Sequence, residues 1–101
     1  MRDSAVIGRR VREARLRIGL SQKQLGIKAG IDEFAASPRI NQYERGKHAP
    51  DFSTAEQLAK ALGVPVPYLY AREDQLADWI LAFGELTFKQ RASVLRRAKL
   101  R

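Results

Sequence analysis

The sequence has no cysteine, a single histidine and no long apolar run. The absence of cysteine excludes disulfides and thiol chemistry, and it fits a reducing compartment. With neither cysteine nor a second histidine in the chain, His48 has no partners for a zinc site. No stretch approaches the roughly 18 apolar residues of a membrane span, and the N-terminus lacks the apolar core of a signal peptide. We therefore expect a cytoplasmic protein with no metal, no cofactor and no membrane partner.

Patterns typical of enzymes are also missing. No nucleophile stands near a base in a known arrangement, and neither a glycine-rich phosphate loop nor a metal-ligand spacing occurs. Glu73 and Asp74 are adjacent on an expected helix, so their carboxylates point in different directions and cannot work as an acid/base pair. We expect no catalytic activity.

Positive charge is what the sequence has in excess. It contains 19 Lys and Arg against 11 Asp and Glu, which gives a net charge of +8. Such a balance favours an anionic partner, with nucleic acid first and a membrane surface next. At 101 residues and 45% hydrophobic content, the chain can form one domain with a real core, or a domain with a small extension.

Helical periodicity runs through the whole chain, and no strand pattern, internal repeat or low-complexity tract is evident. These features predict an all-α protein. A first helix, capped by Asp3 or Ser4, is expected to end near residue 18. Its apolar stripe, at 4-3-4 spacing, consists of Ile7, Val11, Ala14 and Ile18. Arginines at positions 9, 10, 12, 15 and 17 occupy much of the remaining surface, and their simplest interpretation is a solvated face.

Two short helices form the centre of the sequence. Ser21 and Gln24 have the spacing of a capping box at the start of the first, and Gly30 ends it. Gly26 lies in its middle, where glycine costs about 0.5–1 kcal/mol relative to alanine, so we expect another helix to approach closely there. The second helix is expected to start at Ser37 and Pro38, with serine as cap and proline at the first position.

The connection before that helix, residues 31–36, is longer than a tight turn needs. We expect Phe34 to fold back onto the core and Asp32 to cap, at most, one extra helical turn. A fourth helix should begin at Asp51 or Ser53, with Ala55, Leu58 and Leu62 inward. A short fifth helix should begin at Pro67.

From Ile7 to about Tyr70 the sequence resembles the lambda-repressor-like (Cro/repressor type) helix-turn-helix family. The residues of the likeness are Arg15, Gly19-Leu20-Ser21-Gln22, Leu25, Ala29-Gly30-Ile31, Ile40 and Tyr43-Glu44-Arg45-Gly46, continued by residues 58–64. The resemblance implies a five-helix bundle over residues 1–72 whose third helix enters the major groove of operator DNA. Two departures are a longer connection between helices 2 and 3, and Pro38 at a position where the family usually has a hydrogen-bonding side chain.

Carried over position by position, the resemblance implies which side chains read bases. These are Ser37, Pro38, Arg39, Asn41 and Gln42. Glutamine can read adenine and arginine can read guanine through paired hydrogen bonds, each worth about 1–3 kcal/mol of discrimination. For Arg39 a base, a phosphate and solvent all remain open, and for Asn41 either DNA or water.

The expected phosphate-binding residues are Gln22, Arg45, Lys47 and His48. Gln22 begins helix 2, where the helix dipole favours an anion. The other three lie at the end of helix 3 and in the following loop, where cations would meet the DNA backbone. Arg15 and Glu44 match a family pair that bridges helix 1 to helix 3. As a buried pair it would orient the recognition helix more than it would stabilise the fold.

Residues 73–101 are expected to form a helical hairpin that serves as a dimerisation extension. The candidate interface consists of Leu76, Trp79, Ile80, Phe83 and Leu95. Residues 73–85 contain four acids and no Lys or Arg, whereas residues 87–101 contain six Lys or Arg and no acid. The two helices should therefore attract each other, within one subunit or across a dimer. The basic residues could alternatively face solvent or DNA, and Trp79 could stack on a base, although core or interface is more typical of its spacing.

Together these patterns predict a transcription regulator, a repressor that binds double-stranded DNA as a homodimer. A two-fold dimer predicts a pseudo-palindrome with half-sites about 10 bp apart, or a multiple of a turn. An alternative of a different class is a protein-interaction module, such as an antitoxin whose C-terminal hairpin binds a partner protein. A membrane-surface role for the basic last helix comes third.

Overall fold

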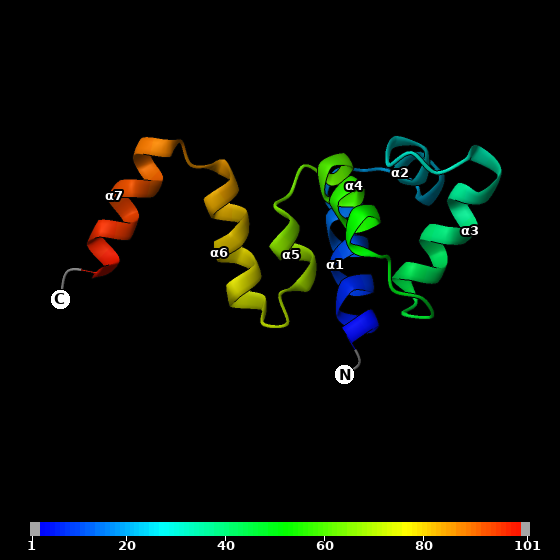
Figure 1. The fold of residues 1–101 in the computed structure, drawn as a ribbon, viewed down its shortest axis with the longest axis horizontal. Helices are drawn as coiled ribbons and strands as arrows, with labels where there is room; N and C mark the ends of the chain where they lie inside the picture. Colours follow the sequence, from blue (N-terminus) through cyan, green and yellow to red (C-terminus); the bar gives the residue numbers. More distant parts are fainter. Residues whose placement is uncertain (1–2, 100–101) are drawn as a thin grey trace.

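The computed structural model describes residues 3–99, and within them it contains seven helices and no strand (Figure 1). The helices are α1 (Asp3–Arg17), α2 (Gln22–Lys28), α3 (Glu33–Glu44), α4 (Phe52–Leu62), α5 (Val66–Tyr70), α6 (Asp74–Glu85) and α7 (Phe88–Lys99). The prediction of an all-α protein is confirmed. None of these helices is long and apolar enough to cross a membrane.

Local capping explains where several helices begin. The Ser21 hydroxyl accepts a hydrogen bond from the Gln24 amide at 3.0 Å, and the Gln24 side chain accepts from the Ser21 amide at 2.8 Å. The predicted capping box is therefore present. Asp51, rather than Ser53, caps α4, since its carboxylate accepts from the Thr54 amide at 2.8 Å. The start of α5 is one residue earlier than predicted, at Val66.

The core lies between α1 and the four helices that follow it. Ile7, Val11 and Ala14 are buried there, as predicted. The prediction for Ile18 is wrong, because α1 ends at Arg17 and Ile18 is 42% exposed. The chain turns away at Gly19, whose φ of 73° belongs to the left-handed region that glycine tolerates. The predicted inward residues of α4, which are Ala55, Leu58 and Leu62, are all buried.

The largest difference between the sequence prediction and the structure is the position where α3 begins. Asp32, not Ser37, is the N-cap, and its carboxylate accepts from the Phe34 amide at 3.0 Å. The stretch expected to be a connection is therefore helical from Glu33, and Ser37 and Pro38 lie inside the helix. Proline is best tolerated at the first position of a helix, so Pro38 indicated a helix start. In the structure it lies beyond the first turn of α3.

A second correction concerns the residue that packs α3 against α2. Phe34 does not fold back onto the core, since it is 85% exposed. Ala36 takes that place and lies against Gly26, where a Cβ would come 2.6 Å from the Cβ of Ala36. The expected close approach of another helix at Gly26 is confirmed, and α3 is that helix.

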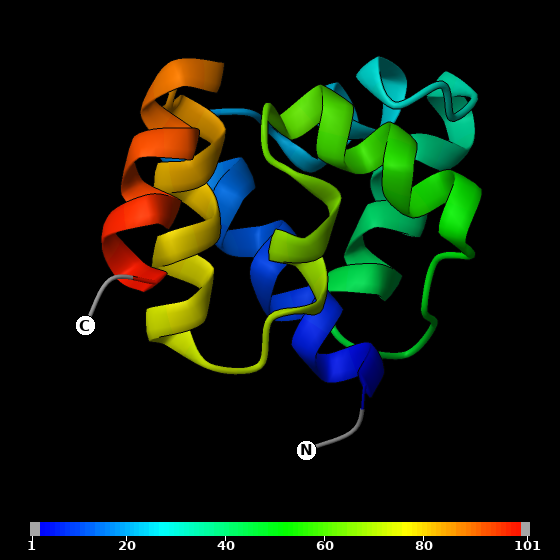
Figure 2. The same ribbon diagram turned by 60° about the vertical axis from the view of Figure 1, so that its left-hand side comes forward.

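The last two helices lie at the opposite end of the molecule from α2 and α3 (Figure 1). The longest dimension of the molecule is 52 Å. Helix α6 packs on the bundle through buried Ala77 and through the half-buried Ile80 and Leu81. Helix α7 lies on the far side of α6 (Figure 2), and none of its described residues is buried.

Candidate nucleic-acid interface

One face of α3 packs on the core and the other faces solvent. Ala36, Ile40 and Tyr43 are buried. The predicted base-reading residues fall mostly on the opposite side, where Pro38, Arg39 and Gln42 are exposed while Ser37 and Asn41 are half-buried. The helix thus presents polar and cationic groups outward from a fixed apolar base, as a helix that reads bases must.

Arg15 of α1 holds the C-terminal end of α3 in place. Its Nε donates to Glu44 Oε2 at 2.6 Å and its Nη2 donates to Glu44 Oε1 at 2.9 Å. Its Nη1 donates to the carbonyl of Leu20, just before α2, at 2.9 Å. The Arg15 side chain is 9% exposed and that of Glu44 is 2% exposed. The hydrogen bond to Glu44 raises the pKa of Arg15. This bidentate contact fixes the orientation of α3 relative to α1.

Gln22 extends the same network from α2 to α3. Its side-chain amide donates to Asn41 Oδ1 at 3.3 Å and to Glu44 Oε1 at 3.2 Å. Gln22, Asn41, Glu44 and Arg15 therefore form one connected polar cluster beside the outward face of α3. The Arg15–Glu44 pair was expected from the sequence, whereas the contacts of Gln22 with Asn41 and Glu44 were not. The three-residue spacing of Asn41 and Glu44, which places both on one side of a helix, was the available signal.

The remaining predicted phosphate-binding residues lie where α3 ends. Arg45, Lys47 and His48 are exposed. The loop between them is held against the start of α1, because the Ser4 hydroxyl donates to the Gly46 carbonyl at 3.0 Å. Lys47 also donates its amide to the Gln42 carbonyl at 3.0 Å. The backbone at Gly46 and Lys47 is therefore held by both α1 and α3.

A buried arginine joins the bundle to α6. Arg10 is 2% exposed, so the interpretation of the α1 arginines as a solvated face is wrong for this residue. Its Nε donates to the Ala71 carbonyl at 2.8 Å, and its Nη1 donates to Glu13 at 2.9 Å. It also lies 3.1 Å from Asp74, which accepts from Arg9 at 2.8 Å. The hydrogen bonds from Arg9 and then Arg10 lower the pKa of Asp74.

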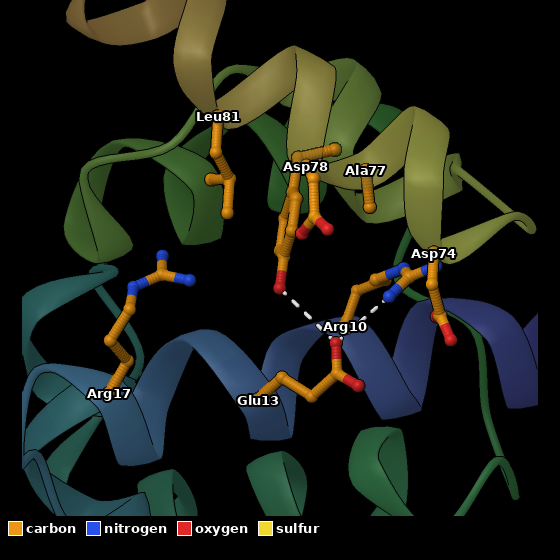
Figure 3. Close-up of a pocket in the computed structure, with 8 residues that line it drawn as sticks. Arg10, Glu13, Arg17, Asp74, Ala77, Asp78 and Leu81 are labelled. Carbon is orange, nitrogen blue, oxygen red and sulfur yellow. Dashed lines mark hydrogen bonds and ion pairs between the residues drawn. The ribbon is translucent and has the colours of Figure 1, made fainter.

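Beside this contact lies a cleft of about 300 Å³ between α1, α5 and α6 (Figure 3). Arg10 and Glu13 of α1 face Asp74 and Asp78 of α6 across it. The Tyr68 hydroxyl donates to Glu13 at 3.3 Å, and burial raises the pKa of that hydroxyl, so it remains a donor. Arg10, Glu13, Tyr68 and Asp74 are linked by hydrogen bonds and an ion pair, and these contacts tie α1, α5 and α6 together.

The predicted dimer-interface residues divide into two groups. Leu76, Trp79, Phe83 and Leu95 are between 46% and 63% exposed. Ile80 instead packs partly against the core of its own subunit. Helices α6 and α7 meet at Phe83, where Arg91 donates to the Phe83 carbonyl at 3.0 Å and its guanidinium lies 3.9 Å from the Phe83 ring centroid. The acid Asp74 binds α1 rather than the basic α7.

Comparisons with known proteins agree with this arrangement. A helix-turn-helix family model matches residues 11–69, which include α2 and α3. A Rhodospirillum rubrum protein named an uncharacterized transcriptional regulator in the ATPase CF(0) region is 34% identical over 67 residues, which are 66% of this chain. Those residues span 58% of that relative's own length. The crystal structure of the transcriptional regulator BswR superposes with a TM-score of 0.85 at 50% identity, covering 91% of each chain. This chain belongs to the helix-turn-helix family of Cro/C1-type DNA-binding transcriptional regulators.

Proposed function

We propose that this regulator is a repressor that binds a pseudo-palindromic operator as a homodimer, with α3 of each subunit in the major groove. The main support is the outward face of α3, which is polar, cationic and rigidly held. The Arg15–Glu44 pair fixes the C-terminal end of α3, and the Gln22 side chain donates a hydrogen bond to Asn41 of the same helix. A side chain that must find a base edge loses less entropy when its helix is fixed beforehand.

The proposed roles follow from whether a residue lies on the outward face of α3, at the start of α2 or just after the end of α3. Ser37, Pro38, Arg39, Asn41 and Gln42 would face base edges, and Gln22, Arg45, Lys47 and His48 would face phosphates. The net charge of +8 supports attraction to DNA of any sequence, whereas only the first group can distinguish sequences. Acting on operator DNA, the protein would work in the cytoplasm.

The proposed dimer uses the C-terminal residues 73–101, with residues 1–72 as the DNA-binding domain. Its support is the apolar face of Leu76, Trp79, Phe83 and Leu95, which is open in the single subunit. Because this face and α3 lie at opposite ends of the 52 Å molecule, pairing through it leaves α3 accessible (Figure 1). Two-fold symmetry would then place the half-sites a whole number of helical turns apart, about 10 bp or a multiple.

Selection of bound duplexes from a random DNA pool, with the solution mass measured alongside, tests this proposal. A dimer that enriches a pseudo-palindrome is the expected result. Transcription from a promoter that overlaps the selected operator should then fall, because the bound dimer occludes it. Enrichment of a single half-site by a monomer would contradict the dimer, and no enrichment at all would contradict sequence-specific binding.

Two substitutions separate base reading from backbone binding. Gln42→Ala should relax the sequence preference at one position, with a loss of about 1–3 kcal/mol on the preferred base. Lys47→Ala should weaken binding to all sequences and reduce the salt slope by about one. Lys60→Ala, at an exposed position near the end of α4, is the matched control and should change neither. If both variants bind like the parent, the proposed docking of α3 is wrong.

The second candidate is a protein-interaction module of the antitoxin kind. The same exposed apolar face on α6 and α7 would then bind a different protein. The mass measurement separates the two, because a stable dimer covers this face and a monomer leaves it open.

A further inference from the structure

The largest unexplained apolar side chain near the proposed interface is Phe34. It lies in the first turn of α3 and is 85% exposed. Its amide is already used by the Asp32 cap, so the backbone there is fixed while the ring projects outward. Ala36, and not the Phe34 ring, packs against α2. Folding therefore does not account for an aromatic ring at this position.

Phe34 lies on the same stripe of α3 as the proposed DNA-facing residues. Phe34, Pro38, Asn41 and Arg45 follow one another at spacings of four, three and four, which places them along one side of a helix. Ala36, Ile40 and Tyr43 occupy the buried side. The stripe thus begins with an aromatic ring and a proline and ends with a cation beside Lys47.

We propose that Phe34 contacts the 5-methyl group of a thymine in the major groove and thereby selects thymine at one operator position. This inference rests on the proposed docking of α3. The thymine methyl is the one apolar group on the major-groove edge, and an aromatic side chain is among those that recognise it. Recognition helices of this fold contact base edges with their N-terminal residues, and Phe34 is the second residue of α3.

The charges of α3 are divided along its length. Asp32 and Glu33 are exposed carboxylates, and phosphates repel them. The cations of the helix lie at Arg39 and beyond its end, at Arg45 and Lys47. The end of α3 is therefore favoured at the phosphates, and its start is kept away from them. Pro38, one turn after Phe34, keeps the adjacent surface apolar, which suits a methyl group.

The test removes the methyl group from the DNA without changing the base pairing. Each thymine of the selected operator is replaced in turn by deoxyuridine, and the affinity is measured for the parent and for Phe34→Ala. The parent should lose about three- to fivefold in affinity for a substitution at one position in each half-site, the size expected for one buried methyl group. Phe34→Ala should bind the thymine and deoxyuridine operators equally.

Phe52→Ala is the matched control, because Phe52 is also an exposed aromatic, 62% exposed at the start of α4. It should retain the parent's preference for thymine. The inference is overturned if the parent ignores every deoxyuridine substitution, if Phe34→Ala keeps the preference, or if Phe34→Ala changes the solution mass without DNA. Failure of the parent to enrich any sequence would instead overturn the proposed function, so the two failures are distinguishable.

Discussion

Helices α1–α5 and the pair α6–α7 use apolar side chains for different purposes. Among the residues that the structure describes, the largest fully buried side chains all belong to the first region, and these are Tyr68, Leu25, Ile40, Leu58, Leu69 and Val11. In the second region only Ala77 is buried, whereas Trp79 and Phe83 are 63% and 50% exposed. The first region therefore obtains its stability from its own core, while the second leaves apolar surface exposed in the single subunit.

The connection between the two regions combines a small apolar contact with a polar one. Ala77, Ile80 and Leu81 pack on the core, and Arg9 and Arg10 contact Ala71, Arg72 and Asp74. Hydrogen bonds to backbone carbonyls fix a direction more than they add stability, because water offers comparable partners to the unfolded chain. The junction thus sets where α6 points, and the bundle does not depend on it for its core.

The largest predicted effect is the difference in unfolding free energy between one substitution in the first region and one in the second. Leu58→Ala removes a side chain that is 0% exposed and should lower the free energy of unfolding by about 2–5 kcal/mol. Phe83→Ala should lower it by less than about 1 kcal/mol, since the ring is half exposed. Chemical denaturation at concentrations where the protein is monomeric measures both. Phe83→Ala should instead weaken self-association, which sedimentation measures. Equal losses of unfolding free energy would refute the contrast.

The next prediction compares two glycines that lie inside helices. A Cβ on Gly8 of α1 would overlap the Tyr43 carbonyl oxygen and come 2.8 Å from that of Glu44, so α1 and α3 must separate. We expect Gly8→Ala to cost about 1–3 kcal/mol of unfolding free energy and to weaken DNA binding. A Cβ on Gly84 of α6 would meet only the Pro65 ring, at 3.2 Å.

Gly84→Ala should therefore stay within about 1 kcal/mol of the parent, because the gain in helix propensity offsets the contact. Thermal denaturation and operator binding of the two variants test the comparison. A Gly84→Ala protein as unstable as Gly8→Ala would mean that α6 is packed as tightly as the bundle.

Much of the bundle could be predicted from sequence because its signals are local and agree. The stripe of Ile7, Val11 and Ala14 and the capping box at Ser21 each depend on residues within two helical turns of one another. The start of α3 was missed because two local signals competed there. Asp32 and the pair Ser37-Pro38 are both good starts, and the packing of Ala36 on Gly26, which periodicity does not reveal, favours the first.

In the candidate site, too, features set by local sequence could be predicted, and features set by distant contacts could not. Outward residues such as Gln42 could be placed from the helix period alone. The burial of Arg10 could not, because it depends on the carbonyls of Ala71 and Arg72, about 60 residues away in the chain. The exposure of Phe34 was missed because aromatic residues are usually buried, and nothing in the local sequence shows that Ala36 rather than Phe34 packs against α2.

The smallest predicted effect concerns the pH dependence of the junction. Arg9 and Arg10 lower the pKa of Asp74 in the folded protein, so this contact stabilises above the ordinary aspartate pKa and is lost as pH falls through the lowered value. Asp74→Asn should melt slightly below the parent at about pH 6, and the difference should shrink as pH falls toward about 3. Asp78→Asn, one turn along α6, retains Asp74 and should preserve the parent's pH dependence at the junction. A gap between Asp74→Asn and the parent that widened in acid would show that Asp74 is held by something other than its charge.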